Sequence, residues 1–355
     1  MLSFIAERAE EDATALVRPG GEAMTYATLA MATSAVMQAL GERVGDVAHR
    51  IVGVAVDEGA AHLASVLAVL EAGGVVLPLD LRRGIPALEV EAARARALAV
   101  IVGDAAEDRL DVVAVDASRR QLPDEACLLL EAGVRRAVHS RRALGVGVDA
   151  IAAALGLAAG ARVPLAGPIA HPTALLTALA TLRAGGAVLV GEPASDAPAG
   201  SVELPRAVDS GEALRLGVFG AHGFAALPGV ELYGDVDGGV VEAHAPTMML
   251  GYLDDPEATR AAFVEREGRR FVRARAVDVV DAAALEGAIA ATPGVREAAV
   301  LAVRDAAGER CYAFVAGDAT CVPRHPARVV ALESLPHRPD GAVDREALRR
   351  MATAD

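Results

Sequence analysis

The sequence predicts an α/β protein in which layers of parallel sheet are flanked by helices and followed by a small α+β domain. Short apolar runs alternate with helical stretches from IVGVAVD (51–57), through a helix in HLASVLAVLEAG, to VVLPLD (75–80). Because crossovers between parallel strands are right-handed, this β-α-β order places helices on both faces of the sheet. After Pro228, closely spaced strand pairs replace the alternation, which predicts antiparallel structure.

The same alternation continues along the chain. A helix is expected around ALEVEAARARA, followed by strands at 98–104, 111–116 and 126–130 that continue the sheet. A helix that begins near Arg141, a strand in ARVPLAG, a second helix over 171–184 and a strand in GAVLVGE come next. Together these elements predict the layered N-terminal region.

Antiparallel pairs dominate the remainder of the sequence. VELYGDVDGGVVEAHA (230–245) predicts two strands that turn at Asp237-Gly238-Gly239, because Asp-Gly is a strong hairpin signal. The polar EREGRR segment (265–270) marks a boundary, after which a helix, a hairpin, a strand and a last helix are expected. We therefore predict an N-terminal region of residues 1–267, subdomains of about 1–165 and 166–267 within it, and a C-terminal domain of 268–355.

The charge balance disfavours several classes of partner. The 355 residues carry a formal charge of −14 and are 53% hydrophobic, so we expect a large core but not the basic footprint that nucleic acid requires. The N-terminal MLSFIAERAEEDA has no basic or apolar region of a signal peptide, and no apolar run reaches the roughly 20 residues of a membrane span. We expect a cytoplasmic protein that binds neither nucleic acid nor membrane.

All 34 basic residues are arginines. The lack of lysine excludes Schiff-base chemistry, a pyridoxal phosphate anchor and a phosphate-loop lysine, because arginine stays protonated and is a poor nucleophile. Cys127, Cys311 and Cys321 have no metal-type spacing, so we expect them to be reduced thiols. We accordingly predict no metal and no cofactor.

Six segments, spread over nearly the whole chain, carry a family resemblance. They are MTYATL (24–29), VLEAGGVVLPLD (69–80), VHSRRAL (138–144), MLGYLDDPEATRAAF (249–263), PGVREAAVLAV (293–303) and LPHRPDGAVDREAL (335–348). In this order they are similar to the adenylate-forming superfamily of acyl-CoA synthetases, nonribosomal peptide adenylation domains and luciferases. The resemblance implies layered N-terminal subdomains and a mobile C-terminal domain. It also implies ATP-dependent activation of a carboxylate and acyl transfer to a thiol of CoA or a carrier protein.

The family's phosphate loop resembles TSGTTGxPKG, in which glycines, hydroxyls and a lysine hold pyrophosphate. The matching residues here, Leu128–Ala137, read LLLEAGVRRA. Gly133 and the basic Arg136 are kept as a remnant of the loop, whereas Glu131 brings a negative charge that repels phosphate. We interpret this segment as a strand end and turn kept for folding.

Other nucleotide-binding motifs of the family are also altered. FGAHG stands where the family carries YGxTE, so Phe219 could still stack on a ring, but His222 and Gly223 replace Thr and the magnesium-binding Glu. The TGD motif falls on Ala274, Arg275 and Ala276, and the hinge segment that follows it in the family is absent. A structural role for Phe219 and His222 is the alternative to a binding role.

The final family motif, GKVDR, reads GAVDR, so Ala342 stands at the position of the catalytic lysine. With four nucleotide-handling positions changed, the chain is identified as a truncated and degenerate member with no catalytic residue in the family sense. His171 matches a family position beside the acyl pocket, and packing at a helix start is its structural alternative. His139 precedes Ser140, which is expected to cap a helix; a base-and-nucleophile pair is the alternative.

Three hypotheses follow for the function. The first is a binding or interaction protein for a carrier protein, an acyl or aminoacyl intermediate or a paralogous adenylating enzyme, in natural-product biosynthesis and with a homodimer allowed. The second is an enzyme of ATP-independent acyl chemistry that uses His171, His139 or His222 as acid or base. The third, an active AMP-forming ligase, is least favoured because the chain has no lysine.

Overall fold

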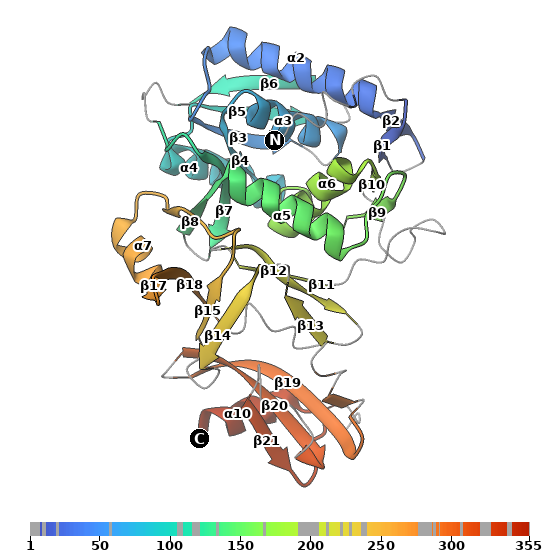
Figure 1. Cartoon of the computed structure of the whole chain (residues 1–355), viewed down its shortest axis with the longest axis vertical. Coiled ribbons are helices and arrows are strands. Elements are labelled where there is room, and N and C mark those ends of the chain that lie inside the picture. Colours follow the sequence, from blue (N-terminus) through green and yellow to red (C-terminus); the bar gives the residue numbers. More distant parts are fainter. Residues whose placement is uncertain are drawn as a thin grey trace. The chain divides into compact units, whose positions relative to one another are not determined.

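The computed structural model shows two compact units, each with its own sheets (Figure 1). The first unit comprises Met1–Leu204 with Pro246–Pro256, and the second comprises Pro205–Ala245 with Glu257–Asp355. The predicted boundary at residue 267 stays a prediction. The structure describes residues 8, 12–18, 21–56, 59–104, 109–115, 121–132, 135–165, 168–190, 206–210, 213–220, 223–226, 229–235, 240–275, 286, 289–290, 292–305, 308–319, 328–338 and 343–354.

A seven-stranded sheet in the order β16-β8-β7-β4-β3-β5-β6 forms the centre of the first unit. Its strands are β3 (Ile51–Val56), β4 (Val75–Pro78), β5 (Ala99–Asp104), β6 (Arg109–Ala114), β7 (Ala126–Ala132), β8 (Arg135–Ser140) and β16 (Gly251–Tyr252). The four central strands, β7, β4, β3 and β5, are parallel, as the β-α-β order predicts. The α/β fold class is therefore confirmed.

The two edges of this sheet differ from the parallel pattern. β6 continues the sheet as expected but runs antiparallel to β5, because residues 105–108 are too few for a helical crossover. β8 runs antiparallel to β7 and to β16. Sequence reasoning missed β8 as a strand, since its two adjacent arginines were assigned to a turn after a strand end.

Helices pack on this sheet according to their apolar patterns. α3 (Ala60–Glu71) is buried around most of its circumference, as expected for a helix rich in Ala, Val and Leu. α4 (Ile85–Ala95) buries only one stripe, made of Leu88, Ala92 and Ala95, and exposes the opposite face. α5 (Arg141–Ala154) begins at Ser140, whose hydroxyl accepts a 3.0 Å hydrogen bond from the backbone N–H of Ala143, which confirms the predicted cap.

A second sheet, in the order β2-β1-β10-β9, completes the first unit. Its strands are β1 (Thr14–Val17), β2 (Ala23–Thr25), β9 (Arg162–Pro164) and β10 (Ala187–Leu189). Tyr26 opens α2 (Tyr26–Val44), and its buried hydroxyl donates to the carbonyls of Leu182, at 3.0 Å, and Gly186, at 2.7 Å. This contact joins α2 to the end of α6 (Pro172–Ala184), so it holds together segments far apart in sequence.

The second unit consists mainly of antiparallel strands. One sheet contains β11 (Arg206–Ser210), β12 (Ala213–Gly220) and β13 (Gly223–Ala226); another orders β14 (Glu231–Asp235), β15 (Val240–His244), β18 (Arg269–Arg275) and β17 (Phe263–Arg266). A third contains β19 (Val295–Asp305), β20 (Gly308–Gly317) and β21 (Arg328–Leu332), packed with α10 (Arg345–Ala354). The predicted hairpins are confirmed as β14–β15 and β19–β20.

Burial explains the state of Cys127. Its side chain is fully buried and free, and burial raises the pKa of its thiol to about 12, so it stays protonated at neutral pH. Cys321 lies outside the described residues. Among the helices that are described, none combines the length and the apolar character needed to cross a membrane.

His62 is a buried histidine whose pKa is strongly shifted. It lies in α3 with 1% of its surface exposed, and its Nδ1 lies 2.9 Å from the carbonyl oxygen of Val56. Its buried Nε2 has no hydrogen-bond partner among the described residues. Burial lowers the pKa of His62 from 6.5 to about 4, because the charged imidazolium is poorly solvated there.

We predict that His62 makes folding sensitive to acid. Because the pKa of His62 is lower in the folded state, neutral His62 contributes its full stabilisation above pH 6.5. This stabilisation is at most about 3 kcal/mol, and it is lost as the pH falls toward 4. His62→Asn should flatten the dependence of the unfolding free energy on pH between 6.5 and 5. His171→Gln, which changes an exposed histidine, should leave that slope unchanged. Equal slopes for wild type and His62→Asn in urea unfolding would contradict this prediction.

Candidate functional site

The residues that match the family's phosphate loop form a tight β-hairpin. β7 and β8 pair through Glu131↔Arg136 and Ala132↔Arg135, so residues 133–134 alone join the two strands. A phosphate cradle requires backbone N–H groups that point freely at the ligand. In this hairpin the strands direct backbone groups to each other, so the described residues form two paired strands rather than the one strand end that the sequence predicted, and residues 133–134 between them lie outside the described residues.

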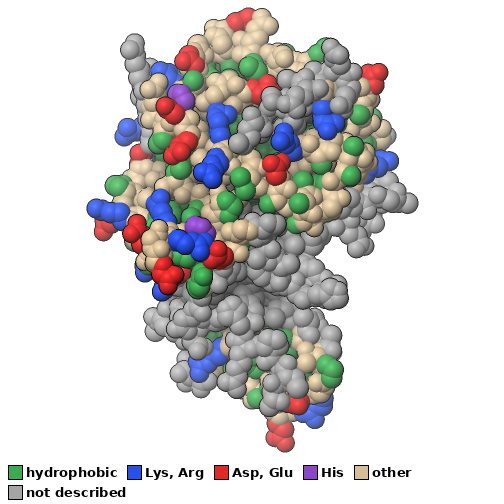
Figure 2. All heavy atoms as spheres, viewed as in Figure 1, with side chains coloured by type: hydrophobic (Ala, Val, Ile, Leu, Met, Phe, Trp, Pro, Cys, Tyr) green, Lys and Arg blue, Asp and Glu red, His purple; other side chains and the backbone are tan. Residues whose placement is uncertain are grey.

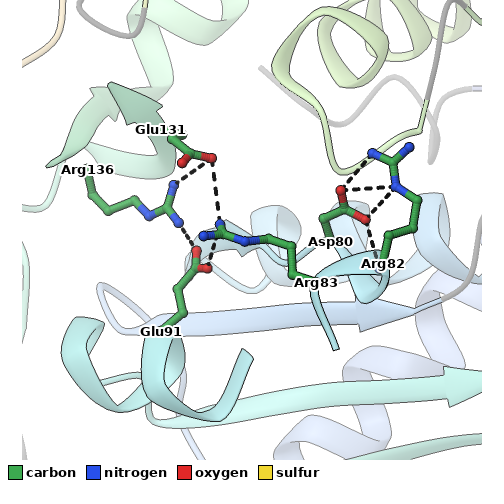
Figure 3. A network of polar contacts seen from close by, with 6 residues as sticks. All are labelled: Asp80, Arg82, Arg83, Glu91, Glu131 and Arg136. Atoms are coloured by element: carbon green, nitrogen blue, oxygen red, sulfur yellow. Dashed lines mark hydrogen bonds and ion pairs between the residues drawn. The ribbon is translucent and has the colours of Figure 1, made fainter. Parts of the chain in front are cut away.

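Four charged side chains gather beside this hairpin and form what we call the arginine–glutamate network, composed of Arg83, Glu91, Glu131 and Arg136 (Figure 3). Arg83 belongs to the short helix η1 (Leu81–Arg83), Glu91 to α4, and the other two to the hairpin strands. Arg136 donates a close hydrogen bond to Glu91 through Nη2. Its Nη1 lies 3.5 Å from a Glu131 oxygen, so one guanidinium faces two carboxylates.

Arg83 meets the same two carboxylates from the opposite side. Its Nη1 lies 3.1 Å from Glu91 and 3.8 Å from Glu131. Glu91 is the inner member, because only 13% of its side chain is exposed, compared with 54% for Glu131. Two arginines and two glutamates therefore neutralise each other, and Glu91 receives the closer contacts.

The burial of Arg136 changes its acidity without removing its charge. Its side chain is 19% exposed, and burial, followed by repulsion from Arg83, lowers its pKa to about 10. At neutral pH the guanidinium is still protonated, and the two carboxylates beside it favour that charge. Over the described residues on the face shown in Figure 2, arginine and acidic side chains are intermixed.

A second ion pair borders the network. Asp80 accepts from the backbone N–H of Arg82 at 3.0 Å, which caps η1, and its carboxylate receives both Nε, at 2.9 Å, and Nη2, at 2.7 Å, of the same arginine (Figure 3). The hydrogen bond from the Arg82 side chain is the main reason that the pKa of Asp80 is lowered. Asp80 is therefore ionised and already neutralised by its own neighbour.

The network forms a wall shared by two hollows of the first unit. A small pocket of about 70 Å³ lies on one side, where Leu129, Leu130 and the start of α6 line it. A larger, open groove of about 960 Å³ lies along α4, where Val90 and Leu253 contribute apolar surface. All four network residues line both hollows.

The fold brings two of the predicted site residues together. His171 precedes the first turn of α6, makes no capping hydrogen bond with its side chain, is exposed, and lines the small pocket together with Arg136. His139 lies in β8 with 0% of its surface exposed, so a substrate could not reach it without local opening. It lines neither hollow.

Several other predicted positions cannot be placed. Phe219 lies in β12, where the structure describes the backbone alone, and Gly133, His222 and Ala342 lie outside the described residues. Arg345, the last residue of GAVDR and the first of α10, donates to Glu286 at 2.8 and 2.9 Å. This pair anchors the start of α10.

Sequence reasoning missed Arg83 and Glu91. Neither falls in a family motif at a nucleotide position, and a helix-surface glutamate normally indicates a solvated face. The available signal was that Arg82 and Arg83 follow Asp80 at the end of a buried strand, since residues after parallel strands meet at one edge of a sheet. The structure adds the helix that brings Glu91 to that edge.

We predict that the inner and outer glutamates differ in their importance for stability. Arg136→Met leaves the poorly exposed Glu91 with one partner and should lower the unfolding free energy by about 1 to 3 kcal/mol. Glu131→Gln removes only the two long contacts of an exposed carboxylate, to Arg83 and Arg136, and should change the unfolding free energy by less than about 0.5 kcal/mol. Urea unfolding of the full chain, with Arg94→Met as the control arginine, checks this, and equal losses would contradict it.

Comparison with known proteins agrees with this architecture. Residues 5–143 match the family model described as AMP-binding enzyme. Over 102 residues, 29% of the chain, the sequence is 32% identical to the hybrid PKS-NRPS synthetase fsa1 of Fusarium sp. (strain FN080326). The matched segment spans only 3% of that synthetase.

Solved structures share the fold over nearly the full length. Apo MatB from Rhodopseudomonas palustris aligns with a TM-score of 0.68 at 18% identity, covering 99% of this chain and 98% of that one. The amide bond synthetase McbA from Marinactinospora thermotolerans aligns at 0.61 and 19%, covering 99% and 100%, and a Mycobacterium tuberculosis fatty acyl CoA synthetase at 0.62 and 17%, covering 99% and 98%. Residues 5–143 therefore resemble AMP-binding enzymes in sequence, and nearly the whole chain shares the fold of the solved synthetases.

Proposed function

We propose that this protein does not activate carboxylates with ATP and serves instead as a binding or interaction protein on the adenylate-forming scaffold. The observation that carries the proposal is the arginine–glutamate network at the hairpin that matches the phosphate loop. There, Glu91 and Glu131 already neutralise Arg83 and Arg136. A triphosphate in this place would meet two carboxylates and would have to separate them from their arginines.

The sequence of the other motifs supports the same proposal. Ala342 stands where the resemblance places the catalytic lysine, and no lysine elsewhere in the chain could replace it. An arginine is a poor substitute, because its planar guanidinium stays protonated and presents a fixed fork of donors. His222 and Gly223 likewise lack the carboxylate that magnesium prefers at the YGxTE position.

The proposed partners are those of an acyl-handling pathway. The protein would bind a carrier protein, an acyl or aminoacyl intermediate, or a paralogous adenylating enzyme. A natural-product context is suggested by the similarity to a hybrid PKS-NRPS synthetase, and by a fold shared with an amide bond synthetase. We propose a cytoplasmic location on the same grounds.

An ATP-independent enzyme is the second candidate function. It is favoured by one observation, that His171 is exposed and lines the small pocket beside Arg136. An imidazole and a guanidinium in one pocket could provide a general base and an electrostatic contact for an acyl group.

Calorimetric titration of the full chain with MgATP tests the proposal. We expect no heat of binding for the wild type, and no ATP–pyrophosphate exchange with a panel of carboxylic and amino acids. Saturable binding at micromolar to millimolar strength, worth roughly 4 to 8 kcal/mol, would overturn the proposal. The Glu91→Gln/Glu131→Gln variant is the matched control, because it keeps both arginines and removes the negative charges that oppose phosphate.

A further inference from the structure

We propose that Arg83 and Arg136 form a binding site for a ligand with a single carboxylate and an apolar body, in which the ligand's carboxylate displaces Glu131. The site faces the groove along α4, and no family motif contains Arg83. This inference rests on the proposed function, because a nucleotide held at the hairpin would compete for the same arginines. It identifies the chemical class of the bound intermediate.

The first argument is the unequal hold on the two glutamates. Both arginines contact Glu91 within hydrogen-bond distance, and its side chain is 13% exposed. Glu131 is 54% exposed and lies 3.5 and 3.8 Å from the guanidinium groups, which is too far for a strong hydrogen bond. Exposed ion pairs of this kind contribute little, so another carboxylate can replace Glu131 at a small cost.

The second argument is the charge that remains after the exchange. With Glu131 turned to solvent, two guanidinium groups and the Glu91 carboxylate leave a net charge of about +1 at the site. One carboxylate restores neutrality, whereas phosphate and pyrophosphate bring further negative charge toward Glu91. Asp80 does not alter this balance, because Arg82 neutralises it. The site therefore favours a monocarboxylate over a polyphosphate.

The third argument is the space beside the arginines. The small pocket of about 70 Å³ has room for roughly two water molecules, so the body of the ligand must lie in the groove of about 960 Å³. There Val90, which is 57% exposed, and the half-buried Leu253 provide apolar contact next to the arginine pair. Covering Val90 would remove exposed apolar surface from water and stabilise the bound state.

Ligand-observed NMR with hexanoate on the full chain tests this inference, with hexan-1-ol and inorganic phosphate as comparison probes. We expect hexanoate to bind with a millimolar Kd, and neither of the other probes to compete with it. Glu131→Gln should tighten hexanoate binding about threefold, because the internal competitor is gone. Arg83→Met should weaken it at least fivefold, and Arg142→Met, which changes an exposed arginine that lines neither hollow, should leave it within twofold.

Besides a complete lack of hexanoate binding, three outcomes would overturn the inference. In the first, hexanoate and hexan-1-ol bind equally well. In the second, Arg83→Met binds hexanoate as the wild type does and has a native circular dichroism spectrum. In the third, Glu131→Gln binds hexanoate and the wild type does not. The last would mean that Glu131 blocks the site in the wild type and is not displaced. Binding of MgATP would overturn the proposed function, whereas a protein that binds neither MgATP nor hexanoate would overturn this inference alone.

Discussion

The antiparallel register of β7 and β8 is the constraint on which the site depends. It places Glu131 opposite Arg136 and leaves only residues 133–134 to connect the strands. A shift of β8 by one residue would turn Arg136 to the other face of the sheet while β7 keeps its pairing with β4, so the register decides whether Arg136 reaches Glu91. Because α4 presents Glu91 at this edge, the arginine has a partly buried partner in the absence of a ligand.

Much of the fold could be predicted from local sequence patterns, meaning the order of apolar and polar residues that are close together in the chain. The parallel order of β3, β4 and β5 could be predicted because fully apolar strands alternate with helices, and the cap at Ser140 because a hydroxyl precedes a helix. The antiparallel edges were harder, since β8 mixes arginines with apolar residues and has no β-branched run. Its pairing is decided by neighbouring strands rather than by its own sequence.

The candidate site could be predicted only in part. Arg136 and His171 were identified from the family resemblance, and the fold places both on one pocket. Arg83 and Glu91 come from elements whose sequences show no chemical motif, so their meeting is a tertiary effect. Core packing and phosphate binding also require different things of the sequence. Ala, Val and Leu are enough to maintain the packing of α3 on its sheet, whereas phosphate binding needs particular polar groups at fixed positions.

NMR of the Arg136 side chain tests most directly whether Glu91 and Glu131 withhold the arginines from phosphate. The Nε–Hε resonance, assigned through Arg136→Lys, would be followed during titration with magnesium pyrophosphate. The account predicts no movement in the wild type and a saturable shift in the Glu91→Gln/Glu131→Gln variant. A saturable shift of the same size in the wild type would contradict it, because the two carboxylates would then not protect Arg136.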